Sequence, residues 1–121
     1  MTAADRILWH AGLSPATDAP GSLAALTAEG EAGDVDAAAN DFIAALDEYN
    51  RGLNGAVPSE RLGGADEYVP RKLAYAVGEV ARMLRVRGLN EAALRVETAW
   101  LAVLAGDIDD IPAHLAEEGI A

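Results

Sequence analysis

Apolar residues recur at intervals of three and four along three long stretches of the sequence, which is the spacing of amphipathic α-helices. The stretches cover residues 34–53, 67–87 and 90–105. In the first, the apolar positions share one helical face: Val35, Ala38, Phe42, Ala45, Leu46, Tyr49 and Leu53. Nowhere do four or more residues alternate clearly between apolar and polar, as they would in a half-buried strand. The pattern therefore predicts an all-α fold.

Proline, glycine and capping residues bound the long stretches. Pro70 falls in the first turn of the second stretch, where its missing N–H is tolerated, and Gly88 is expected to end that helix. Asn90 is the predicted N-cap of the third helix, which Gly106 ends. Shorter helices are predicted at residues 3–11, 22–29 and 111–118.

The expected architecture is an antiparallel helical bundle of three long and two or three short helices, forming one domain over residues 1–121. Two of the long helices are joined by the turn at Gly88, so these two should run antiparallel. Ser22 and Asp110 are positioned to cap two of the short helices. The connection over residues 52–65 is rich in glycine and should be the longest loop, either a lid, a partner contact or a plain connection.

The segment that begins at Gly33 and ends at Leu46 resembles the second helix of a tetratricopeptide repeat. In that family a glycine precedes the helix, and small, aromatic and small residues follow at the spacing of Ala38, Phe42 and Ala45. The resemblance does not recur in the third long helix, whereas a repeat array needs about three repeats with a period near 34 residues. It implies helical-hairpin packing.

Charge narrows the classes of partner. The formal net charge is −11, and binding to duplex nucleic acid depends on neutralising phosphates with Lys and Arg, so no nucleic acid partner is expected. The acidic side chains of the first long helix should be largely exposed: Asp36, Asp41, Asp47 and Glu48. Frequent alanine and a preference for arginine over lysine favour a bacterial origin with a high-GC genome, and salt adaptation is the alternative explanation.

The sequence offers no membrane segment. Its longest purely apolar run covers residues 99–105, far short of the roughly 18 residues that span a bilayer. The apolar residues near the N-terminus are interrupted by His10, so no signal-peptide apolar region of about 7–15 residues is present. There is no cysteine. We expect a cytoplasmic protein without a membrane partner.

The sequence lacks the usual metal and cofactor motifs. His10 and His114 lie near opposite ends of the sequence, and neither has a second metal ligand four residues away. Glu117 and Glu118 follow His114 by about one turn, a spacing typical of a surface ion pair. No phosphate-binding glycine loop and no nucleophile elbow occur. No metal site and no cofactor are expected.

Glu97 is the one candidate for acid–base chemistry. On a helical wheel it falls between Leu94, Trp100, Leu101 and Leu104, inside an apolar face where a carboxylate is costly unless it is paired. A structural ion pair is preferred over a general acid or base there. The expected partner is an arginine of the neighbouring long helix, with Arg82 as first choice and Arg87, or Arg71 of a second subunit, as alternatives.

The second long helix carries a basic stripe opposite its apolar face, formed by Arg71, Arg82 and Arg85 with Tyr75 among them. In so acidic a chain, this stripe is expected to pair with the acidic helices or to bind an anionic ligand or partner.

The third long helix is apolar over most of its circumference, so it should lie centrally or at a subunit interface. We expect a homodimer whose interface includes Trp100, Leu101 and Leu104, with Trp100 as its anchor.

Three classes of function remain open. The preferred one is a non-enzymatic interaction or assembly module. The second is a small acidic inhibitor or immunity-type protein that mimics an anionic surface. The third is a small enzyme that uses Glu97 as a general acid or base.

Overall fold

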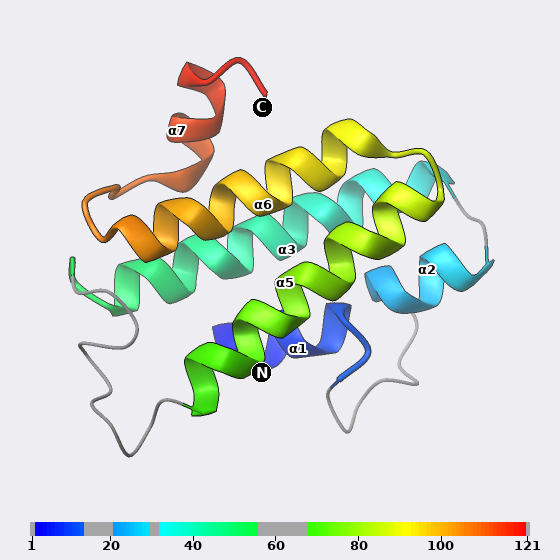
Figure 1. Ribbon diagram of the computed structural model, residues 1–121, viewed down its shortest axis with the longest axis horizontal. Helices are drawn as coiled ribbons and strands as arrows, with labels where there is room; N and C mark the ends of the chain where they lie inside the picture. Colours follow the sequence, from blue (N-terminus) through cyan, green and yellow to red (C-terminus); the bar gives the residue numbers. More distant parts are fainter. Residues whose placement is uncertain (1, 14–20, 30–31, 56–67, 121) are drawn as a thin grey trace.

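The computed structural model describes residues 2–13, 21–29, 32–55 and 68–120, and each regular element in these ranges is an α-helix (Figure 1). The helices are α1 (Ala3–His10), α2 (Leu23–Glu29), α3 (Ala32–Gly52), α5 (Tyr68–Val86), α6 (Asn90–Ala105) and α7 (Ile111–Glu117). The predicted all-α fold is confirmed, and no predicted helix end differs from the observed one by more than two residues. Of the predicted 52–65 loop, residues 56–65 lie outside the described ranges.

The long helices reverse direction in turn: α3 runs one way, α5 returns beside α6, and α6 runs parallel to α3 (Figure 1). α6 packs against both α3 and α5. On the other side of the bundle α1 and α2 each pack against α3 and α5, so two short helices take the place of a fourth long one. The largest fully buried side chains come from all of these helices and from α7: Ile7, Leu23, Phe42, Leu46, Leu73, Leu84, Val96, Ile111 and Leu115.

The small and aromatic residues that resemble a tetratricopeptide helix face the core. Ala38, Phe42 and Ala45 are all buried, as helical-hairpin packing requires. Gly33, however, lies inside α3 rather than before it. The likeness is therefore one of helix packing.

Several helix ends follow the predicted chemistry. The Ser22 Oγ accepts a hydrogen bond from the Ala25 N–H at 3.1 Å, and an Asp110 carboxylate oxygen accepts one from the Ala113 N–H at 3.0 Å. Gly106 ends α6 with a left-handed φ of 79°.

The prediction that Asn90 is the N-cap of α6 is wrong, because the helix begins at Asn90 itself. Leu89 occupies the cap position and Asn90 is already helical. Gly88 has a left-handed φ of 77°. The Gly88 N–H donates to the Arg85 carbonyl and the Leu89 N–H donates to the Leu84 carbonyl, both at 2.9 Å, so both residues bond to the last turn of α5. Leu89 also packs on the core, and it takes part both in the C-terminal end of α5 and in the N-terminal cap of α6.

α7 lies across the outside of the bundle against α3 and α6 (Figure 1). The Asn50 side-chain N–H donates to the Ile108 carbonyl at 2.6 Å, and an Asp47 carboxylate oxygen accepts from the Ile111 N–H at 3.0 Å. Asp47 is thus mostly buried, contrary to its expected exposure, because it satisfies a free amide at the start of α7.

No helix in the described part of the chain is both long and apolar enough to cross a membrane.

Candidate functional site

The outer face of the α5–α6 hairpin carries most of the residues that the sequence singled out. α5 lies in front in Figure 1, with α6 alongside it and antiparallel to it. Arg71, Tyr75, Arg82 and Arg85 are exposed on α5, and Leu101 and Leu104 are exposed on α6. Helix packing thus brings the predicted basic stripe and the predicted apolar residues onto one hairpin.

Glu97 pairs with an arginine of the neighbouring long helix, as predicted, but the partner is Arg85 and not Arg82. Both terminal nitrogens of Arg85 donate to the Glu97 carboxylate, one of them at 2.9 Å. Counted equally from the turn at residues 87–89, Glu97 would meet residues 79–82, so the observed pair shows that the two helices do not meet at equal distances from the turn. Arg82 lies about 4.5 Å further along α5 and binds Glu79 of its own helix at 2.9 Å.

Glu97 is not buried, contrary to its expected place inside an apolar face. Its side chain is 40% exposed, because this side of α6 faces outwards. The hydrogen bonds from Arg85 lower the pKa of Glu97 and outweigh the opposing effect of partial burial. An ionised carboxylate held in this way is a poor general acid, so the geometry does not favour acid–base catalysis at this position.

Exposure makes the expected effect of removing the pair small. In the monomer, Glu97→Ala and Glu97→Gln should each leave the chemical-denaturation midpoint close to that of the wild type, because water solvates Arg85 when its partner is gone. Urea denaturation followed by circular dichroism measures this. A large loss in Glu97→Ala alone would mean that the pair is shielded, for instance by a subunit interface.

The apolar residues of α6 divide between the core and the surface. Trp100, the expected interface anchor, is only 8% exposed and is already buried within the chain. Leu94, Leu101 and Leu104 are 46%, 62% and 42% exposed and recur at intervals of seven and three, so they form one stripe. We call these three residues the leucine stripe.

Gly78 leaves open space on the exposed surface of α5. A Cβ placed at Gly78 would meet no heavy atom within 4 Å. The surface of α5 is therefore free of a large side chain at this point.

Sequence reasoning missed a polar network between α1, α2 and α3. The His10 ring is 1% exposed, and its Nδ1 accepts a hydrogen bond from the Leu23 N–H at 3.1 Å. Its Nε2 therefore carries the proton and donates to Asp41 at 2.8 Å. Arg6 donates to Asp41 at 2.6 Å and to Glu48 at 2.8 Å.

The network sets the ionisation of its members. Burial lowers the pKa of His10, and it outweighs the hydrogen bond and charge of Asp41, which act in the opposite sense. For Asp41, partial burial is the largest single influence and would raise the pKa, but the hydrogen bonds from His10 and Arg6, with their charges, together lower it. Both ring nitrogens are occupied, so the network is a structural clamp. The spacing of these residues was the signal that the sequence offered for the network. Arg6 and His10 are four residues apart and share one face of α1, and Asp41 and Glu48 are seven residues apart and share one face of α3.

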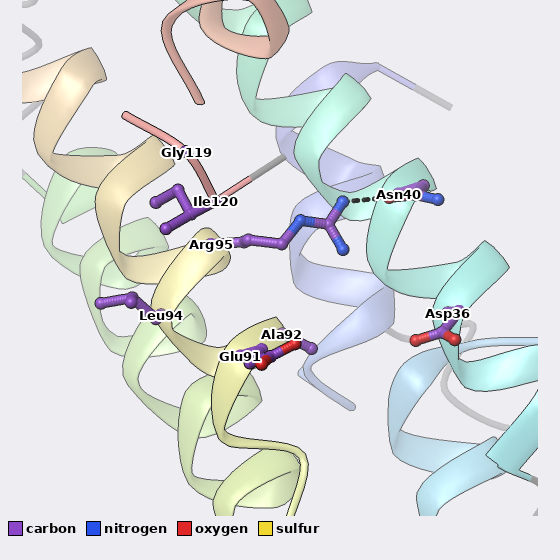
Figure 2. A pocket seen from close by; sticks show the side chains of 8 residues that line it. All are labelled: Asp36, Asn40, Glu91, Ala92, Leu94, Arg95, Gly119 and Ile120. Atoms are coloured by element: carbon purple, nitrogen blue, oxygen red, sulfur yellow. Dashed lines mark hydrogen bonds between the residues drawn. The ribbon is translucent and has the colours of Figure 1, made fainter. Parts of the chain in front are cut away.

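A groove of about 730 Å³ lies between α3, α6 and the turn after α7 (Figure 2). Its walls are formed by Asp36, Asn40, Glu91, Ala92, Leu94, Arg95, Gly119 and Ile120. Arg95 reaches across from α6 and donates to the side-chain oxygen of Asn40 on α3. The helical position of Arg95 gave no sign of this groove, so Arg95 was not predictable as a site residue.

No known protein family, curated protein or solved structure matches this chain. Among the residues that the structure describes, no three imidazole or carboxylate groups are grouped as a metal site requires. The function is therefore argued from the geometry of the surface.

Proposed function

We propose that this chain is a non-enzymatic assembly module that forms a homodimer through the outer face of its α5–α6 hairpin. The observation that carries the proposal is the leucine stripe, in which three large apolar side chains stay exposed on one side of a helix whose other sides are packed. Apolar residues gathered on one face mark interaction surfaces more reliably than scattered ones.

The distribution of charge supports a second copy of the chain as the occupant. Residues 68–105 contain six Arg or Lys and three Glu, whereas the rest of the chain contains three Arg and seventeen Asp or Glu. Two copies that met symmetrically through any other surface would bring strongly acidic regions together. Hairpin-to-hairpin contact keeps those regions apart, and a two-fold axis makes the stripe pack against itself.

The surroundings of the stripe fit such a contact. The open surface at Gly78 on α5 lets a second helix approach the hairpin closely, although a glycine there costs about 1 kcal/mol of helix propensity relative to alanine.

Substitution of the stripe tests the proposal. Sedimentation velocity should show a dimer for the wild-type chain, and Leu101→Glu combined with Leu104→Glu should weaken dimerisation by a factor of about ten or more, because charged groups would be buried at the contact. Ala44→Glu, at an exposed position of α3, is the matched control and should leave the dimer intact.

The same measurement separates the alternatives. A wild-type chain that remains a monomer at all accessible concentrations contradicts the proposal. If that monomer binds basic proteins and loses them as salt is raised, the acidic-inhibitor function takes its place, because the surface outside the hairpin is the strongly acidic one.

A further inference from the structure

Arg95 differs from four other arginines in the described part of the chain. Arg6, Arg51, Arg82 and Arg85 each bind at least one carboxylate. Arg95 instead makes one hydrogen bond, to the neutral side-chain oxygen of Asn40, and its Nε is buried without a partner. A guanidinium that binds no carboxylate and leaves a buried Nε without a hydrogen bond stands out in a chain with 20 acidic residues.

Two carboxylates lie one helical turn from this guanidinium. Asp36 precedes Asn40 by four residues on α3, and Glu91 precedes Arg95 by four residues on α6. Because α3 and α6 run parallel, both acids lie at the same end of the groove, about 6 Å along the helices from Arg95 (Figure 2). The acids line the groove with Arg95 but form no ion pair with it.

The groove therefore holds two opposite charges, separated along its length and flanked by apolar side chains. Ala92 and Leu94 belong to α6, and Ile120 follows α7 (Figure 2). A ligand complementary to these walls carries one negative group for Arg95, one positive group for the acids, and carbon between them.

We propose that the groove binds a small amino carboxylate, such as an ω-amino acid or a short peptide, with its carboxylate on Arg95 and its ammonium group between Asp36 and Glu91. The guanidinium offers N–H donors to the carboxylate, and the two acids accept from the ammonium group. An inorganic phosphate is disfavoured because it would face both acids, and a polyamine because it would face Arg95.

The groove lies within one chain, so the site is complete in a monomer, and Leu94 is the residue that it shares with the leucine stripe. Sedimentation velocity on the same samples shows whether ligand binding and dimerisation succeed or fail separately.

A titration of the ¹⁵N-labelled protein with γ-aminobutyrate, followed through its amide resonances, tests the proposal. Shifts are expected at residues 36–40 and 91–95. Butyrate and butylamine, which each keep one of the two charged groups, should bind about tenfold or more weakly, because each loses a charge-assisted contact.

Substitutions assign the two ends of the ligand. Arg95→Gln should weaken γ-aminobutyrate binding about tenfold or more, and so should Asp36→Asn combined with Glu91→Gln, which changes exposed side chains and leaves Arg95 in place. Arg51→Gln, at an exposed arginine outside the groove, should leave the titration unchanged. If Arg95→Gln fails to fold, the double variant at the acidic end decides the outcome.

Weak binding of small ligands has dissociation constants near the millimolar range. If no amide resonance shifts at γ-aminobutyrate concentrations up to about 10 mM, the proposal is overturned. Equal binding of butyrate and γ-aminobutyrate would also overturn it, since the ammonium end would then play no part.

Discussion

His10→Ala is expected to lower the free energy of unfolding by about 3–5 kcal/mol, the largest effect among the substitutions considered. The buried ring fills space between α1, α2 and α3, and its edge meets the Phe42 ring with centroids 5.8 Å apart. Its removal leaves a cavity and deprives the Leu23 N–H and Asp41 of a hydrogen-bond partner each. Urea denaturation measures the loss.

Two isosteric variants separate the contributions of the ring nitrogens. The side-chain oxygen of asparagine can take the position of Nδ1, so His10→Asn should keep the bond from the Leu23 N–H and recover part of the loss. The amide group of glutamine can reach the position of Nε2, so His10→Gln should keep the bond to Asp41. His114→Ala, on α7, is the control and should change stability by less than about 1 kcal/mol. If His10→Ala were as mild as this control, the clamp would have no structural role.

Stability is expected to fall as the solution is acidified, in two steps. Burial lowers the pKa of His10 in the folded state, so below its ordinary value near 6.5 the unfolded chain takes up more protons than the folded chain. The stabilising effect of the neutral ring is therefore present above that pH and is lost as pH falls. Protonation would also add a proton to Nδ1, which would remove the acceptor of the Leu23 N–H.

The second step comes from Asp41. Its pKa is also lowered in the folded state, so its contribution is present above the ordinary value near 3.8 and is lost as pH falls through the lowered value. Both steps have the same sign. Urea midpoints measured between about pH 7.5 and pH 3 should decline throughout. In His10→Gln the step near neutral pH should disappear while the acidic step remains, and an unchanged profile in that variant would contradict the assignment to His10.

The secondary structure was predictable because it depends on local spacing. Intervals of three and four between apolar residues placed α3, α5 and α6, and Gly88 and Gly106 marked two helix ends through backbone conformations that glycine adopts readily. The same local reasoning failed at Asn90, because its role depended on how tightly the turn from α5 was closed.

The polar contacts depended on tertiary packing. The residue pattern was enough to predict an all-α, strongly acidic chain with a basic α5 and an amphipathic α6, and it indicated that Glu97 would pair with an arginine of a neighbouring helix. The packing of the helices was needed to show that the arginine is Arg85, that His10 joins three helices, and that Trp100 faces inwards while Leu101 faces outwards. A helical wheel gives the angle of a side chain about its own axis, whereas its contacts depend on the register and position of the neighbouring helices, which local spacing does not encode.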